Sequence, residues 1–210
     1  LSIRRQRQMC IRDRILYGIS EGDDLWKIKN AVKAGMGIYQ LRDKLADEDE
    51  LGEKILNIKS EIDGKCLFIL NDNLKLAKKY GTALHLGQED EKISRAREVL
   101  GRDEIIGATA KTVKLGIEAE NMGASYIGTG AFFETETKKD ASRITLERFK
   151  EIREALLIPV FPIGGISKDR LDFFTGLDLD GLCMSRAIFS VREDEVEKNV
   201  REIIEKLNNL

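Results

Sequence analysis

The chain has 210 residues, of which 42% are hydrophobic and 34% charged, with a formal net charge of −2 at pH 7. This length suits one sizeable domain or at most two small ones, and the composition is that of a soluble globular protein. No stretch approaches the roughly 18 apolar residues of a membrane span, and we see no apolar segment of the secretory-signal type near the start.

The charge is distributed unevenly along the chain. Residues 1–14 carry five arginines against one aspartate, a net charge of +4, whereas the remainder has 30 basic and 36 acidic side chains, a net charge of −6. An acidic body argues against a nucleic-acid-binding protein. A nucleic-acid arm and a mitochondrial-type presequence are two interpretations of residues 1–14. We favour a third, a non-native or irrelevant extension, because residues 8–14 resemble translated sequencing-adaptor sequence.

The three cysteines, Cys10, Cys66 and Cys183, are odd in number and far apart. No two of them have the spacing of a metal site or a redox motif. We therefore expect reduced thiols in a cytoplasmic protein.

From residue 15 onward, short apolar runs alternate with charged segments. Eight such runs occur, at residues 15–20, 37–42, 66–71, 83–87, 105–109, 126–130, 160–164 and 181–185. The segments between them have helical spacing; in residues 47–62 and 193–207, for example, apolar residues recur every three or four positions. Apolar strands alternating with amphipathic helices indicate a parallel sheet covered by helices.

Eight such units in about 195 residues predict a single (β/α)8 TIM barrel spanning residues 15–210. The structural rival is an open doubly wound sheet, which usually has fewer strands and does not need to close. In a barrel the active site lies at the carboxyl ends of the strands, so the residues that follow each run are the place to look for chemistry.

Acidic side chains follow the third and fourth strands. Asp72 and Asp90 lie at the ends of neighbouring strands, so their carboxylates could share a cation. Mg²⁺ prefers a few carboxylates together with water and substrate phosphate oxygens. The alternative is an Asx turn around Asp72 and an exposed acid at Asp90.

Basic residues follow the second strand. Arg42 and Lys44 are two positions apart, so on an extended strand end they could face the same side and bind a diphosphate. A solvated pair of loop charges is the alternative interpretation.

Two further loops suit a phosphate group. After the sixth strand, the loop at residues 128–138 places Thr135, Thr137 and Lys138 together, although such loops are often merely solvated. After the seventh strand, Gly164 and Gly165 precede a helix expected near Ser167, whose first amides could hold an anion; a simple turn is the alternative.

His85 is the only histidine, which excludes metal sites built from several histidines. We expect it to pack or to form hydrogen bonds rather than to act in catalysis. Trp26 and the phenylalanine pairs at 132–133 and 173–174 are expected in the core or a pocket wall rather than on a platform for nucleic-acid bases.

Taken together, these residues resemble the thiamine phosphate synthase family. The resemblance extends from residue 16 to residue 188. It is carried by the segments Gln40-Leu41-Arg42-Asp43-Lys44, Asn71-Asp72, His85-Leu86-Gly87-Gln88-Glu89-Asp90, Thr135-Glu136-Thr137-Lys138 and Ile163-Gly164-Gly165-Ile166. Each segment alone is weak evidence for the family, but the order and spacing of the segments together are specific to it. Thr109 departs from the family, which usually has serine at this position.

The resemblance implies a transferase that joins 4-amino-2-methyl-5-hydroxymethylpyrimidine diphosphate to a thiazole phosphate, carboxylated or not, and releases pyrophosphate. It implies a dissociative reaction assisted by Mg²⁺, in which the diphosphate leaves before the thiazole nitrogen attacks.

The resemblance also assigns residues, each by its place in a matching segment. The metal would be held by Asp72 and Asp90. The implied site for the pyrimidine diphosphate consists of Gln40, Arg42, Lys44, Asn71, Thr109 and Lys138. Among these, the residues that stabilise the leaving group would be Arg42, Lys44 and Lys138. The implied site for the thiazole phosphate consists of Thr135, Thr137, Gly165, Ser185 and Arg186.

Two other functions are considered on the same barrel. One is a thiazole tautomerase, which has no use for a diphosphate-bound metal; the other is a non-catalytic barrel that binds thiamine phosphates. The expected partners are small-molecule substrates, with no nucleic acid and no membrane, and a homo-oligomer is left open.

Overall fold

The structure is a computed structural model that describes residues 15–62, 64–134 and 143–210. Its strands are β1 (Ile15–Ser20), β2 (Ile38–Leu41), β3 (Leu67–Asn71), β4 (Ala83–Leu86), β5 (Ile106–Thr109), β6 (Tyr126–Gly130), β7 (Val160–Ile163) and β8 (Gly181–Met184). They pair in parallel in chain order, and β8 pairs with β1, so the sheet closes. The predicted (β/α)8 barrel is confirmed, with each strand boundary within one residue of the expected one.

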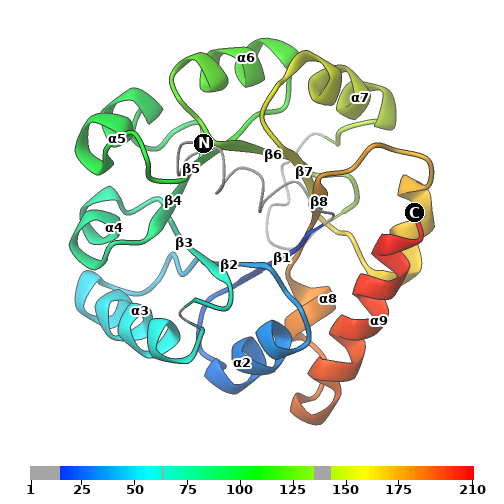
Figure 1. The fold of residues 1–210 in the computed structure, drawn as a ribbon, viewed down its shortest axis with the longest axis horizontal. Helices are drawn as coiled ribbons and strands as arrows, with labels where there is room; N and C mark the ends of the chain where they lie inside the picture. The colour runs from blue at the N-terminus through cyan, green and yellow to red at the C-terminus, as the bar shows by residue number, and fades with distance from the viewer. Residues whose placement is uncertain (1–14, 63, 135–142) are drawn as a thin grey trace.

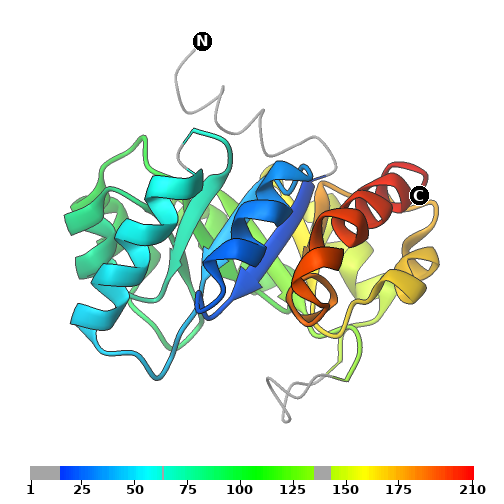
Figure 2. The same cartoon turned by 90° about the horizontal axis from the view of Figure 1, so that it is seen from below.

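Helices surround the strands as an outer ring, seen down the barrel axis in Figure 1 and from the side in Figure 2. The α-helices are α2 (Leu25–Lys33), α3 (Glu48–Ile62), α4 (Leu74–Tyr80), α5 (Ile93–Leu100), α6 (Val113–Asn121), α7 (Leu146–Ala155), α8 (Arg186–Phe189) and α9 (Val196–Asn208). Two 3-10 helices, η1 (Lys168–Phe174) and η2 (Glu193–Glu195), complete the set described. The side chains of Asp24, Asn73, Thr112 and Thr145 cap four α-helices by accepting backbone N–H groups.

The helix expected near Ser167 is a 3-10 helix, η1, and not an α-helix. Its two buried apolar residues, Leu171 and Phe174, are three apart, a spacing that the three-residue turn of a 3-10 helix places on one face. The helix expected over residues 193–207 likewise begins with the 3-10 turn η2 and becomes α-helical only at Val196.

Two hydrophobic layers lie on the two faces of the barrel wall. The inner layer fills the barrel and includes Tyr17, Ile38, Ile69, Tyr126, Phe161 and Cys183. The outer layer lies between strands and helices and includes Ile28, Ile55, Ile58, Phe149 and Ile203, all at most 1% exposed. Because successive strand residues face opposite sides, one apolar run supplies both layers.

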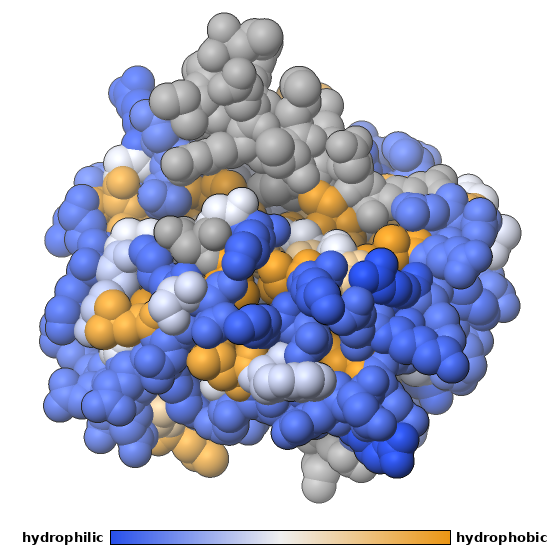
Figure 3. Space-filling view, turned by 60° about the horizontal axis from the view of Figure 1, so that its bottom comes forward, coloured by the Kyte–Doolittle hydropathy of each residue, from blue (hydrophilic) through white to orange (hydrophobic). Residues whose placement is uncertain are grey.

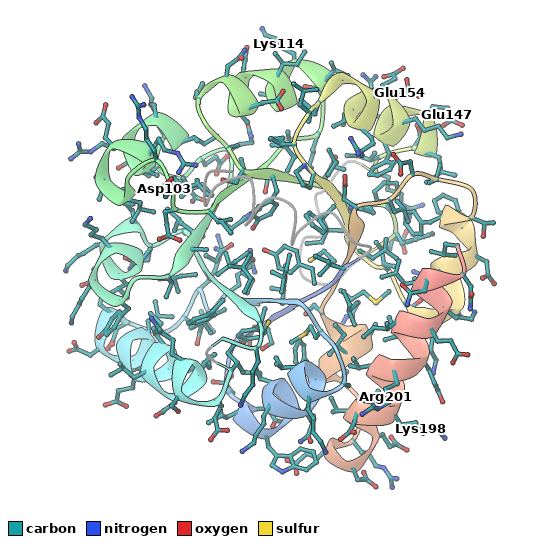
Figure 4. All side chains as sticks on the ribbon, viewed as in Figure 1. Asp103, Lys114, Glu147, Glu154, Lys198 and Arg201 are labelled. Carbon is teal, nitrogen blue, oxygen red and sulfur yellow. The ribbon has the colours of Figure 1, made fainter. Side chains whose placement is uncertain are left out.

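The face of the molecule shown in Figure 3 is mainly hydrophilic, with apolar side chains among the hydrophilic ones. Charged side chains such as Lys114, Glu147 and Lys198 point away from the barrel (Figure 4). Trp26 on α2 and Phe173 on η1, which we expected in the core or a pocket wall, are 49% and 44% exposed, so that expectation is wrong for both. In the part of the chain that the structure describes, no helix combines the length and apolar character needed to cross a membrane.

We expect Ile203→Ala to lower the free energy of unfolding by about 2–5 kcal/mol, because a fully buried side chain on α9 is replaced by a cavity. Urea denaturation measures the change. Ile117→Ala on α6 is the matched control, since that side chain is 40% exposed and its truncation should change the free energy by less than about 1 kcal/mol. Equal losses for the two variants would contradict this account of the outer layer.

Candidate active site

Polar residues predicted at the strand ends come together at one mouth of the barrel. Strand pairing sets Gln40 beside Ile69 and Asn71 beside His85, and Thr109 pairs with Gly128. Gln40 is buried, whereas Asn71 and Thr109 are half-buried where β3 and β5 end. Arg42 directly follows β2, and its backbone N–H donates to the carbonyl of Ser20.

The two predicted acids meet across neighbouring loops. Asp72 lies just after β3 with a φ of 63°, a left-handed conformation, and its backbone N–H donates to the carbonyl oxygen of His85 at 2.8 Å. Asp90 closes a turn after β4 by accepting the Gly87 N–H at 2.6 Å. The two carboxyl groups are close enough for each to shift the pKa of the other.

The closeness of the two carboxyl groups changes how each binds a proton. Burial, followed by the hydrogen bond and the charge of Asp90, raises the pKa of Asp72 to about 6. Burial also acts to raise the pKa of Asp90, but the hydrogen bonds from Asp72 and from the Gly87 N–H outweigh it and lower that pKa. The Asp72–Asp90 pair therefore retains one proton in mildly acidic solution, where two isolated carboxyl groups would both be ionised.

Lys44 reaches this acidic pair from the loop after β2. Its ammonium nitrogen lies 3.5 Å from a carboxylate oxygen of Asp72, while its side chain remains 58% exposed. Three predicted site residues from three separate loops, Lys44, Asp72 and Asp90, are thus neighbours.

Asp43, for which we predicted no role, anchors the loop that carries Lys44. It accepts the backbone N–H groups of Leu45 and Ala46 and forms a 2.6 Å ion pair with Lys54 of α3. Burial tends to raise the pKa of Asp43, but these contacts outweigh it and lower the pKa. The signal in the sequence was an aspartate in the loop directly after a strand, a position where its carboxylate can accept the backbone N–H two residues on and form an Asx turn.

The expected thiazole-phosphate residues that are described leave the barrel side by side. β7 pairs with β8 through Ile163 and Cys183, and Gly165 and Ser185 each follow two residues later. Arg186 is exposed at the start of α8.

Glycine is required at position 165. Its φ is 66°, and a Cβ there would lie 2.6 Å from the carbonyl oxygen of Glu134. The close approach packs the loop after β7 against the one after β6. Three further predicted residues, Thr135, Thr137 and Lys138, lie outside the described residues, so their roles stay predictions.

The residues present fit a magnesium ion better than a closed metal cage. Among the described residues, no group of three histidine, cysteine, aspartate or glutamate side chains gathers as a metal site. The Asp72–Asp90 pair instead offers two carboxylates at an open mouth, which suits an ion that completes its shell with water and substrate phosphate oxygens.

Fold and site together define a class: (β/α)8 barrels with a carboxylate pair and a lysine at the mouth. The chain matches the TMP-TENI family, described as thiamine monophosphate synthase, over residues 10–188. It therefore belongs to this family, as the sequence motifs indicated. As a member of this family the chain is an enzyme, and the predicted transferase class is confirmed.

Curated relatives agree along nearly the whole chain. A thiamine-phosphate synthase of Fusobacterium nucleatum is 35% identical over 208 residues, 95% of this chain and 100% of the relative. One of Methanosarcina mazei is 35% identical over 92% of this chain and 80% of the relative.

A solved structure agrees as well. Thiamine phosphate pyrophosphorylase from Pyrococcus furiosus superposes with a TM-score of 0.83 at 28% identity, covering 96% of this chain and 98% of that one.

We expect Asp72→Asn to stabilise the metal-free protein near pH 7.5 by about 1 kcal/mol. A raised pKa in the folded state means that stability falls as pH rises from about 4 through 6 and stays lower above it. A shift of two units corresponds to about 3 kcal/mol, which we reduce because solvent reaches 30% of the side chain. Asparagine tolerates the left-handed backbone and removes the charge.

Thermal unfolding in EDTA at pH 4 and pH 7.5 measures this effect, with Asp103→Asn as an exposed control. The gain in melting temperature should be present at pH 7.5 and vanish near pH 4. A gain of equal size at both pH values would show that ionisation of Asp72 is not its cause.

Proposed function

We propose that this protein joins 4-amino-2-methyl-5-hydroxymethylpyrimidine diphosphate to 4-methyl-5-(2-phosphoethyl)thiazole, or to its carboxylated form, giving thiamine phosphate and pyrophosphate. The carboxylated form would release CO2 as well. The observation that carries the proposal is the Asp72–Asp90 pair with Lys44 beside it, at the mouth of a barrel of this family. That arrangement suits a diphosphate leaving group.

Asp72 and Asp90 are the residues that would hold Mg²⁺. When bound there, the ion would supply positive charge that neutralises the diphosphate as its bond breaks. Without a cation the two carboxylates repel each other and any incoming phosphate, so the acidic pair has an electrostatic reason to bind one.

The reaction begins with heterolysis of the bond between the pyrimidine methylene carbon and the diphosphate oxygen. The electron pair leaves with the diphosphate, and a pyrimidine-stabilised cation remains. Arg42, Lys44 and Lys138 stabilise the charge that accumulates on the leaving group. Gln40, Asn71 and Thr109 hold the pyrimidine substrate in place.

The thiazole ring nitrogen then donates its electron pair to the methylene carbon and forms the new carbon–nitrogen bond. Thr135, Thr137, Gly165, Ser185 and Arg186 bind the thiazole phosphate, which positions that nitrogen for attack. No side-chain nucleophile is needed, because both bond changes occur between the substrates.

The cellular setting is part of the proposal. Cys66 is half-buried and Cys183 is buried, and both are free thiols, as a reducing cytoplasm would leave them. The proposed partners are the two small-molecule substrates and Mg²⁺; an oligomer of identical chains stays open.

The decisive assay combines the purified protein with both substrates and measures pyrophosphate with Mg²⁺ and with EDTA. We expect release only with Mg²⁺. Asp72→Asn should lower kcat/KM at least about tenfold, equivalent to roughly 1.4 kcal/mol of barrier, because one metal carboxylate is lost. Glu89→Gln, an exposed neighbour of Asp90, is the matched control and should keep activity within about twofold of wild type.

Three outcomes would contradict parts of this proposal. Full activity of Asp72→Asn with tight substrate binding would remove the metal assignment. Metal-independent isomerisation of the thiazole without pyrophosphate would indicate a tautomerase, and binding of thiamine phosphates without turnover would indicate a non-catalytic barrel.

A further inference from the structure

A continuous chain of hydrogen bonds crosses the barrel interior beneath the mouth. It begins at the amide nitrogen of Gln40, which donates to the Tyr17 hydroxyl at 2.6 Å. The Tyr17 and Tyr126 hydroxyls are 2.8 Å apart, and the Tyr126 hydroxyl lies 2.9 Å from Nδ1 of His85. The chain ends where Nε2 of His85 lies 3.0 Å from Oγ1 of Thr109. Five strands contribute one residue each.

The barrel interior is shaped around this chain. A Cβ at Gly107 would lie 2.0 Å from the Tyr126 ring, so only glycine leaves room for it. The Tyr17 ring packs edge-on against Tyr126 and Phe161, with centroids 6.0 and 5.7 Å away. The hydroxyls are therefore held in place by packing as well as by their hydrogen bonds.

Once the first donor of this hydrogen-bond chain is fixed, every bond in it can point in only one donor-to-acceptor direction. Burial raises the pKa of both Tyr17 and Tyr126, so each hydroxyl keeps its single proton. A Tyr17 oxygen that accepts from Gln40 donates its own proton to Tyr126, which in turn donates to Nδ1 of His85. The ring proton of a neutral His85 then resides on Nε2, from which it is donated to the Thr109 oxygen.

We propose that Tyr17, Tyr126 and His85 are positioning residues that orient Gln40 and Thr109, the two ends of the pyrimidine diphosphate site, as one unit. Because the Thr109 oxygen accepts the ring N–H, its own proton is directed to a third partner. Thr109 lies at the carboxyl end of β5, so that partner is an oxygen of the substrate diphosphate. This last step rests on the proposed function; the direction of the chain does not.

The single histidine makes the chain directly observable. In protein labelled with ¹⁵N-histidine, a two-bond ¹H–¹⁵N spectrum of the ligand-free protein at pH 8 distinguishes the two neutral tautomers of His85. We expect Nδ1 unprotonated and Nε2 protonated. Tyr126→Phe removes the donor to Nδ1, so the ring-nitrogen signals of His85 should move toward those of mixed tautomers. In the same variant kcat should fall roughly tenfold, with the KM for the thiazole phosphate unchanged.

Tyr39→Phe is the matched control. Tyr39 is an equally buried tyrosine whose hydroxyl lies 2.8 Å from that of Ser20, outside the chain, so its loss should leave the His85 spectrum and kcat unchanged. A wild-type protein with the proton on Nδ1 would overturn the proposed direction, whether or not Tyr126→Phe folds. An unchanged spectrum and kcat in a folded Tyr126→Phe would overturn the positioning role. If the protein had the expected His85 tautomer but no synthase activity, the proposed function would be contradicted and the direction of the hydrogen-bond chain would be supported.

Discussion

The pairing of β8 with β1 is the constraint on which the rest of this structure depends. In a closed parallel barrel every strand has a neighbour on both sides, so all carboxyl ends meet at one rim and alternate side chains must face inward. Residues as far apart in sequence as Gln40 and Thr109 are therefore brought to the same interior without direct contact. An open sheet of the same strands would place β1 and β8 at opposite edges and separate the residues that leave them.

Parallel pairing of neighbouring strands also brings like charges together. Because β3 pairs with β4, the loops after them leave the barrel side by side and place Asp72 close to Asp90. Burial, followed by the interaction with Asp90, raises the pKa of Asp72. The nearby ammonium of Lys44 offsets only part of this repulsion, because it is largely exposed. Under the proposed function, a divalent cation with a bound diphosphate would relieve this repulsion, because the cation would neutralise the two acids and the diphosphate would pair with Lys44.

The sequence predicted most of what depends on local pattern. Strands were recognisable because fully buried parallel strands are continuous apolar runs, and the Asp72–Asp90 meeting followed from strand order alone. The 3-10 character of η1 and the exposure of Trp26 were missed, because both depend on how neighbouring helices pack. Tyr17 and Tyr126 were absorbed into apolar runs, since no periodicity separates a tyrosine that packs from one whose hydroxyl meets another across the barrel. The contact between them spans 109 positions.

The polar chain inside the barrel explains how such an interior can hold polar residues near a site without losing stability. A buried hydroxyl costs free energy unless it is hydrogen-bonded. Each polar group inside the barrel therefore needs a polar neighbour, and the neighbours form a continuous series. Here the series ends at the buried Gln40 and at the half-buried Thr109, the two residues that we propose bind the pyrimidine substrate. The hydrogen bonds that satisfy these buried groups thus also hold their side chains in fixed positions beneath the site. The loops above supply the charged groups.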